Sequence, residues 1–349
     1  MHYSRPKLKT SVSSVRYNAR MSGTTWSLRN KSILVTGGAG FIGSHLVDRI
    51  LEENPARIVV VDNFFLGNDQ NLESAFLNSN DLEVIRLDAS DFPAMQDIVR
   101  ANGTDVVFDL ATIPLPTSLS FPNWTINTNV GIATTFCELA RLEEISQLVH
   151  LSSSEAYGSA LYVPMDELHP HNASTPYAAS KSAGDIIIQS YVETYNINAT
   201  IVRPFNNFGP RQNLGSYAGI IPIIVRNVVQ GRPIEIYGDG LQTRDFIFVT
   251  QTVDMIVKIF GTPQCHQGTY NVASGVETSI NELVKRMLDL MNVPEYPIQH
   301  LSPRIGDVRR HCADVKKTSA AIGKIPTPIE PDQLMQTIEW YFTKVSQGS

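Results

Sequence analysis

The arrangement of elements around one glycine-rich segment limits the possible folds more than any other feature of the chain. The apolar run 31–36 predicts a buried parallel strand, and the glycine-rich segment 37–43 follows it directly. An amphipathic pattern then predicts a helix over 44–53, and 57–62 predicts a second strand that ends in Asp62. A strand, a glycine-rich turn, a helix and a strand with a terminal acid are together typical of a dinucleotide-binding unit.

The residues of this unit have separate expected roles. Gly37 allows a tight turn, Gly40 lets the backbone approach a diphosphate, and Gly43 lets the helix pack closely on the strand. The helix N-terminus offers free N–H groups and a positive dipole end to phosphates. Asp62 would accept hydrogen bonds from ribose hydroxyls and repel a 2′-phosphate, which favours NAD over NADP.

The alternation of strands and helices continues after this unit. Further strands are predicted over 82–88, 105–111, 148–151 and 199–203, and helices over 127–142 and 177–195. Prolines predict a loop over 113–117. Open parallel sheets bind their ligands beyond the carboxyl ends of the strands. The predicted cofactor site comprises Gly37, Gly40, Phe41, Ile42, Gly43, Asp62, Asn63, Asp88, Ala89, Leu110, Ala111 and Thr112.

Hydroxyl groups and one carboxylate follow the strand predicted over 148–151. Ser153, Ser154 and Glu155 are therefore expected at a carboxyl end of the sheet. Tyr177 and Lys181 are four residues apart and share one face of a predicted helix. A free phenol has a pKa of about 10, and a neighbouring lysine cation lowers it. Tyr177 is thus the predicted base that takes a proton from an alcohol while a hydride leaves the carbon.

After Pro204 the pattern changes to that of a smaller lobe. A polar loop is predicted over 206–212, a helix over 222–230, and a return toward the large sheet over 243–249, while Arg304 is one of several cations available for an anion. The predicted organisation is α/β: a basic flexible tail over 1–29, a Rossmann-type doubly wound NAD-binding domain over 30–204 with 242–264, and a smaller C-terminal α/β substrate lobe over 205–241 and 265–345.

Composition and charge exclude several functional classes. The net charge of −6 argues against a general nucleic-acid binder. Cys137, Cys265 and Cys312 form no CxxC pair, so we expect no metal site and a reducing, cytoplasmic location. No apolar run is long enough to cross a bilayer. The acid-free, basic stretch 1–29 is expected to be a flexible tail, with a transit peptide or a true start at Met21 as alternatives.

Several motifs together resemble those of the extended short-chain dehydrogenase/reductase family. They are the glycine-rich segment 36–43, Ser154, the Tyr177-x-x-x-Lys181 pair and the segment 206–211. Within that family the chain resembles the NAD-dependent nucleotide-sugar epimerases and dehydratases. The resemblance implies that Tyr177 is the base, that Lys181 also binds the nicotinamide ribose, and that Ser154 aligns the sugar hydroxyl. It thereby adds Tyr177 and Lys181 to the predicted cofactor site.

The same resemblance implies the ligands and the assembly. It implies tightly bound NAD and a nucleotide-sugar substrate, while the net charge and the lack of a long apolar run predict neither nucleic acid nor a membrane as partner. The residues that fall where the family holds the nucleotide diphosphate and the sugar are Asn206, Arg211, Tyr237, Arg244 and Arg309. Enzymes of this kind are commonly homodimers, and the helices predicted over 127–142 and 177–195 are suited to pair across a two-fold axis.

Glu155 distinguishes the possible reactions. In the family a sugar hydroxyl, usually at C4, is oxidised first, and the 4-keto sugar is then epimerised, dehydrated or decarboxylated. Plain epimerases usually carry a small residue at position 155, whereas Ser153-Ser154-Glu155 resembles the triplet of some 4,6-dehydratases and uronate decarboxylases. We predict a UDP-sugar 4,6-dehydratase. A UDP-sugar 4-epimerase, a UDP-glucuronate decarboxylase and an NAD-binding regulatory protein on the same fold stay open as alternatives.

Overall fold

The computed structural model describes residues 26–215, 218–303, 308–324 and 326–347. Most of the predicted tail, with Met21, lies outside these ranges, as does Arg304. The expectations for those residues therefore stay predictions.

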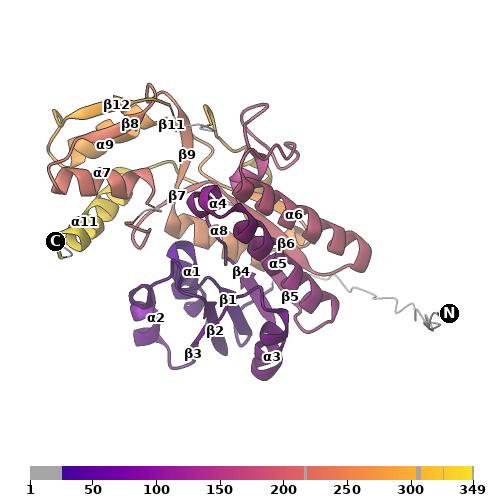
Figure 1. Ribbon diagram of the computed structural model, residues 1–349. Coiled ribbons are helices and arrows are strands. Elements are labelled where there is room, and N and C mark those ends of the chain that lie inside the picture. Colours follow the sequence, from indigo (N-terminus) through magenta and orange to yellow (C-terminus); the bar gives the residue numbers. More distant parts are fainter. Residues whose placement is uncertain (1–25, 216–217, 304–307, 325, 348–349) are drawn as a thin grey trace, which may run out of the picture.

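A seven-stranded sheet, in which every pair of neighbours is parallel, forms the centre of the larger lobe (Figure 1). Its order reverses between β1 and β4, because the chain runs from β1 out to β3 and then returns to β4. Open parallel sheets bind ligands at such a switch point. In spatial order the strands are β3 (Leu82–Arg86), β2 (Arg57–Asp62), β1 (Ser32–Thr36), β4 (Val106–Asp109), β5 (Gln147–Leu151), β6 (Ala199–Pro204) and β10 (Thr269–Val272).

Helices cover both faces of this sheet, and each face has its own apolar core. Within β1, Ile33 and Val35 enter one core and Leu34 enters the other, because successive side chains of a strand point to opposite faces. The predicted Rossmann-type doubly wound sheet is confirmed. The first core includes α1 (Phe41–Leu51), α2 (Glu73–Asn78) and α8 (Val249–Gly261), and the second includes α3 (Phe92–Asn102), α5 (Pro122–Arg141) and α6 (Pro176–Tyr195).

A smaller group of elements, mostly from the C-terminal half, surrounds a third apolar core at the upper left of Figure 1. It contains a three-stranded sheet of β7 (Asn206–Phe208), β9 (Thr243–Phe248) and β11 (Glu277–Ser279), and a parallel pair of β8 (Ile234–Tyr237) and β12 (Ile298–Leu301). Its helices are α7 (Ile220–Val229), α9 (Ile280–Leu290) and α11 (Pro331–Gln347). The remaining short helices are η1 (Asp69–Leu72), α4 (Leu115–Ser120), η2 (Ser154–Tyr157), η3 (Pro263–Cys265) and α10 (Lys316–Ile322).

Proline-rich segments near the cofactor side differ from the sequence-based expectation. The predicted loop 113–117 is partly helical, because α4 begins at Leu115. Helix α5 begins at Pro122, ahead of the predicted start at 127. In both helices a proline occupies the first turn, where its missing N–H and its fixed φ are compatible with a helix. Proline occupies the first turn of these two helices, whereas the sequence pattern predicts that it forms a loop.

Three strands of the second half also differ from the expectation. The predicted polar loop 206–212 begins with β7, which pairs with β9. The stretch 243–249 forms β9 in the three-stranded sheet, and α8 rather than β9 returns to the large sheet. Strand β10 lies within 265–345, predicted for the smaller lobe, but it hydrogen-bonds to β6 of the large sheet. These pairings join residues far apart in sequence, so a single strand pattern does not reveal them.

A membrane-spanning helix requires a long apolar stretch, and a metal site requires a group of ligating side chains. None of the described helices is both long and apolar enough to cross a bilayer. Within the described ranges, no group of three or more His, Cys, Asp or Glu side chains is placed to hold a metal ion. Cys137, Cys265 and Cys312 are buried free thiols.

Candidate active site

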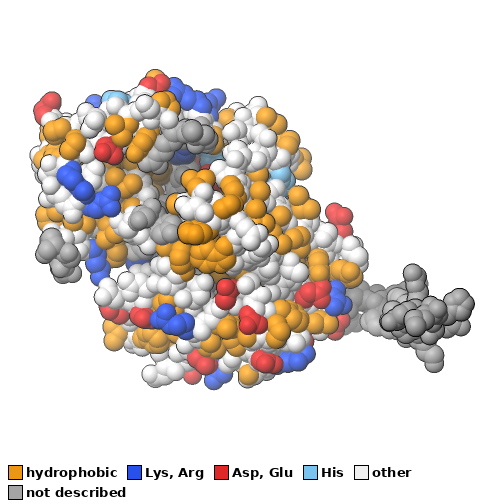
Figure 2. All heavy atoms as spheres, viewed as in Figure 1, with side chains coloured by type: hydrophobic (Ala, Val, Ile, Leu, Met, Phe, Trp, Pro, Cys, Tyr) orange, Lys and Arg blue, Asp and Glu red, His pale blue; other side chains and the backbone are white. Residues whose placement is uncertain are grey.

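A cavity of about 500 Å³ opens at the carboxyl ends of the large sheet, beside the switch point. Figure 2 shows this face hollowed between the two lobes, with hydrophobic side chains gathered beside the hollow. All fourteen residues of the predicted cofactor site line this one cavity: Gly37, Gly40, Phe41, Ile42, Gly43, Asp62, Asn63, Asp88, Ala89, Leu110, Ala111, Thr112, Tyr177 and Lys181.

The glycine-rich turn leaves no room for side chains. Gly37 has φ +64°, and a Cβ on it would lie 2.9 Å from the backbone nitrogen of Ala111. A Cβ on Gly43 would lie 2.1 Å from the Gly37 carbonyl oxygen. Helix α1 then begins at Phe41, and its N-cap Gly40 makes no side-chain cap hydrogen bond. No side chain of the N-cap residue therefore caps the first N–H groups of α1. A diphosphate site requires such uncapped N–H groups.

The acid at the end of β2 is placed to meet a ribose. Asp62 is 7 % exposed and lines the cavity. Its carboxylate accepts from the backbone N–H groups of Ala39 (3.0 Å) and Phe64 (2.8 Å). Burial raises the pKa of Asp62, and these two hydrogen bonds oppose the rise. Each carboxylate oxygen has a further lone pair, so the residues present fit a dinucleotide whose ribose hydroxyls donate to Asp62.

Tyr177 lines the same cavity as Ser153 and Thr112. Burial raises the pKa of the Tyr177 phenol to about 12, the hydroxyl groups of Ser153 and Thr112 oppose the rise, and the charge of Glu155 adds to it. The predicted lowering of this pKa is therefore not found, because burial outweighs the other effects. Ser153 and Glu155 both line the cavity with Tyr177.

Ser153, and not Ser154, is the serine that meets Tyr177. Ser153 precedes the one-turn helix η2 in an extended conformation, and its hydroxyl accepts from the N–H of Glu155 (3.1 Å). Ser154 is 4 % exposed and is not among the described residues that line the cavity. Of the two predicted serines, Ser153 is the one that lines the cavity with Tyr177, and the alignment of a sugar hydroxyl by either serine stays a prediction. Ser153 is the last extended residue and Ser154 is the first residue of η2, so the two adjacent serines differ in backbone conformation.

Lys181 is anchored to the strand behind this site. The lysine is 4 % exposed, and its Nζ donates to the Leu151 carbonyl oxygen at 2.8 Å. Burial lowers the pKa of Lys181, whereas the charges of Asp109 and Asp185 raise it. The two carboxylates thus help to keep the ammonium charged in a buried position.

The predicted substrate residues are divided between two places. A second cavity of about 640 Å³ is lined by Tyr237 and Arg244, and Asn206 lines both cavities. Arg211 and Arg309 are not among the described residues that line either cavity. Arg211 pairs with Asp48 of α1 at 2.7 Å, and Arg309 pairs with both carboxylate oxygens of Asp239 at 2.7 and 3.0 Å. Each arginine is therefore paired with a carboxylate and does not line either cavity in the part of the chain that the structure describes. The spacing of residues in the sequence does not show these ion pairs.

Two buried polar groups that we had not predicted support the cavity wall. Asn129 of α5 accepts from the Ile113 N–H (2.7 Å) and donates to the Ser180 hydroxyl of α6 (2.9 Å). Asp109 lies 2.6 Å from His150 Nδ1 and accepts from the Thr36 hydroxyl at 2.7 Å. The helical period of α5 was the available signal, because it places Asn129 on the buried face.

The Thr36 hydroxyl also accepts from the N–H groups of Leu110 (3.0 Å) and Ala111 (3.1 Å), which line the cavity. The pairing of Asp109 with Thr36 therefore helps to fix this part of the wall. No periodicity or motif in the sequence distinguishes Asp109 or His150 from their neighbours.

The family and its solved structures agree with this geometry. The model of the NAD dependent epimerase/dehydratase family matches residues 33–273. The chain is 34 % identical to a UDP-glucose 4-epimerase of Mycolicibacterium smegmatis, over 89 % of this chain and 98 % of the relative. It is 28 % identical to a dTDP-glucose 4,6-dehydratase of an Actinoplanes species, over 88 % and 97 %.

Two solved structures represent the same two activities. A UDP-N-acetylglucosamine 4-epimerase from Methanobrevibacter ruminantium superposes with a TM-score of 0.83 at 30 % identity, covering 90 % of this chain and 99 % of its own. The dTDP-glucose 4,6-dehydratase DesIV from Streptomyces venezuelae, solved with NAD bound, gives 0.83 at 28 % identity, covering 90 % and 98 %. The resemblance to NAD-dependent nucleotide-sugar enzymes is confirmed, and NAD is the cofactor. The chain belongs to the NAD-dependent epimerase/dehydratase family.

Proposed function

We propose that the protein is a nucleotide-sugar 4,6-dehydratase, acting on a UDP-sugar through a transient 4-keto intermediate. The observation that carries the proposal is the position of Glu155, which lines the same cavity as Ser153 and Tyr177 and whose charge raises the pKa of the phenol. A base for alcohol oxidation and a separate carboxylate are thus present together. Dehydration requires both, because a proton leaves the C4 hydroxyl first and the C5 carbon afterwards.

The protein's own groups would perform the proton transfers. NAD, when bound, would accept the hydride from C4 and supply the same hydride to C6. Ser153 holds the C4 hydroxyl, and Tyr177 takes its proton. Glu155 would then remove the C5 proton, which the 4-keto group has made acidic, and pass it to the C6 hydroxyl, which leaves as water. Hydride return to C6 would be matched by a proton that Glu155 takes from solvent and delivers to C5. The proton held by Tyr177 would return to solvent, so the net loss is one water and C4 stays a ketone.

Lys181 would keep the phenol reactive during this sequence. A phenol with a pKa of about 12 holds its proton near neutral pH. A charged Lys181 close to the nicotinamide ribose favours the phenolate electrostatically. Asp109 and Asp185 preserve that positive charge against burial.

A 4-epimerase is the second candidate, and it is favoured by the 34 % identity to the epimerase of Mycolicibacterium smegmatis. Epimerisation uses Ser153 and Tyr177 in the same first step, but it needs no base at C5. Under that alternative Glu155 would serve only to orient neighbouring groups. The role of Glu155 therefore separates the two candidates.

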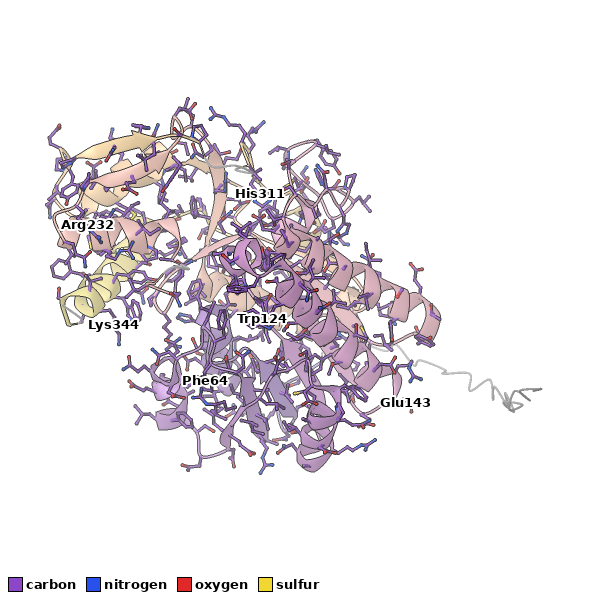
Figure 3. The ribbon with its side chains drawn as sticks, in the orientation of Figure 1. Phe64, Trp124, Glu143, Arg232, His311 and Lys344 are labelled. Carbon is purple, nitrogen blue, oxygen red and sulfur yellow. The ribbon has the colours of Figure 1, made fainter. Side chains whose placement is uncertain are left out.

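The variant Glu155→Gln tests the proposal, with Glu143→Gln as its matched control. Glu143 is exposed just beyond the C-terminal end of α5, whereas Trp124 lies in the first turn of that helix (Figure 3). We expect Glu155→Gln to bind NAD and to form NADH when UDP-sugar is added, but to stop before loss of water. Full dehydration by Glu155→Gln would contradict Glu155 as the C5 base.

We further propose that the protein is a homodimer formed through α5 and α6. These two long helices pack against each other, and Ile126 and Ile186 are 38 % and 55 % exposed on them. Apolar side chains on paired helices suit an isologous interface. Light scattering after gel filtration should give the dimer mass for the native chain and a smaller mass for Ile186→Glu, and a monomeric native chain would contradict the assembly.

We also place the protein in a reducing, cytoplasmic compartment. Support comes from Cys137, Cys265 and Cys312, which are free and buried. Fractionation of cells that express the full chain tests this placement, and recovery in an organelle or outside the cell would contradict it.

A further inference from the structure

The segment 206–213 forms the wall between the two cavities. Asn206, Asn207 and Gln212 line both of them, and Asn213 lines the first. The position of this segment therefore affects the shape of the cofactor cleft and of the second cavity together. Three contacts hold the middle of the segment from behind.

The first contact is the ion pair between Arg211 and Asp48. Arg211 Nη1 lies 2.7 Å from Asp48 Oδ2, and the two side chains are only 19 % and 27 % exposed. The backbone of Arg211 has φ +68°, in the left-handed region that a residue with a Cβ seldom adopts. Such a conformation persists where the surrounding contacts impose it. The ion pair directs the guanidinium to α1 and away from the cavities.

The second contact comes from the same face of α1. His45 is three residues before Asp48, and its Nε2 lies 3.0 Å from the Pro210 carbonyl oxygen. Because a carbonyl only accepts, Nε2 must carry the hydrogen. Burial lowers the pKa of His45 to about 4, so the ring is neutral near pH 7. This donor is therefore constant over the neutral range.

The third contact comes from α11. The Tyr341 hydroxyl lies 2.9 Å from the Gln212 carbonyl oxygen and 3.2 Å from that of Gly209. Tyr341 is fully buried. The segment is thus held on one side by the helix that begins at the glycine cradle, and on the other by the C-terminal helix.

We propose that Arg211 is a positioning residue, which with Asp48 clamps segment 206–213 to α1 and so sets the shape of the nucleotide-sugar cavity. The ligand is the one assigned by the proposed function, on which this part of the inference rests. The clamp gives Arg211 a different role from the diphosphate contact that its motif suggests. It also ties the substrate wall to the helix that receives the cofactor.

Nucleotide affinity separates a clamp from a direct contact. UDP and dTDP are titrated calorimetrically into the NAD-loaded native chain, Arg211→Gln, Asp48→Asn and the double variant. A clamp predicts that each single variant weakens nucleotide binding by roughly tenfold, about 1.4 kcal/mol. It also predicts that the double variant binds no more weakly than the single variant with the lower affinity. The clamp is overturned if Arg211→Gln weakens binding while Asp48→Asn leaves it unchanged, because Arg211 would then contact the nucleotide directly.

A control and a ligand-free measurement complete the test. Arg49→Gln removes a neighbouring ion pair of α1, with Asp254 of α8 at 2.9 Å, and should leave nucleotide affinity unchanged. If the native chain binds neither nucleotide, the proposed substrate class fails. The clamp is still decided by urea unfolding of the same four proteins, where it predicts non-additive shifts in midpoint, and additive shifts would overturn it.

Discussion

Lys181 donates a hydrogen bond to the carbonyl oxygen of Leu151, with the two atoms 2.8 Å apart. Leu151 is the last residue of β5, two positions before Ser153. The helix that carries Tyr177 and Lys181 is thereby tied to the strand that precedes Ser153. This bond fixes the position of helix α6 relative to strand β5, and it holds the Lys181 side chain in the wall of the cavity.

The charge of Lys181 should set the pH at which Tyr177 works. Lys181→Met removes a cation that favours the phenolate, so we expect turnover near neutral pH to fall by about 100-fold and the pH–rate profile to move to higher pH. Initial rates measured across the pH range check this. Lys181→Arg is the control because it keeps the charge, and it should retain the native profile. An unshifted profile for Lys181→Met would show that Tyr177 does not depend on this cation.

Ser153 and Ser154 are adjacent but should differ sharply in function. Ser153→Ala removes a hydroxyl that lines the cavity and lowers the pKa of Tyr177, and it also removes the cap of η2, so we expect kcat to fall by roughly 100-fold. Ser154→Ala changes a buried hydroxyl outside the cavity, and it should keep kcat within a few-fold. Steady-state kinetics of both NAD-loaded variants measure the difference. Equal losses would contradict the assignment of Ser153.

Acid should destabilise the protein partly through His45. Burial lowers its pKa from 6.5 to about 4, so the unfolded chain takes up a proton at a higher pH than the folded chain does. Its stabilising contribution is present above pH 6.5 and is lost as the pH falls toward 4. Between pH 7.5 and 5 the native chain should lose about 2 kcal/mol more stability than His45→Gln. Urea unfolding at both pH values measures this, and equal losses would contradict it.

The buried pair of Arg203 and Asp185 should be costly to break on one side. Arg203 Nε lies 2.7 Å from Asp185 Oδ2, and the side chains are 1 % and 0 % exposed. Asp185→Asn leaves an uncompensated buried charge, so we expect unfolding free energy to fall by about 3–5 kcal/mol. Replacing both residues with Asp185→Leu and Arg203→Met should recover much of the loss. Chemical denaturation checks both, and a loss below about 1 kcal/mol for Asp185→Asn would refute the expectation.

The cofactor half of the site could be predicted from sequence because its signals are local. Gly37, Gly43 and Asp62 belong to one continuous unit whose order determines its geometry, and the structure brings them together in one cavity. Tyr177 and Lys181 are four residues apart on one helix, so their shared face follows from helical geometry.

The remaining features depend on contacts between distant segments. Arg211 meets Asp48 and Arg309 meets Asp239, and no spacing in the sequence indicates either pair. The choice between Ser153 and Ser154 depends on where an extended residue gives way to η2, a difference of one position. Element boundaries and arginine partners are set by tertiary packing, which a local pattern does not contain.

Product analysis by proton NMR tests the central claim of dehydration most directly. The protein is incubated with UDP-N-acetylglucosamine, UDP-glucose, UDP-glucuronate and dTDP-glucose, and the sugar signals are followed over time. Dehydration predicts loss of the C6 methylene signals and a new C6 methyl doublet from at least one UDP-sugar. A changed H3–H4 coupling alone would show epimerisation, and a pentose formed with CO₂ would show decarboxylation. Either of those results without the methyl doublet would contradict the proposed 4,6-dehydratase.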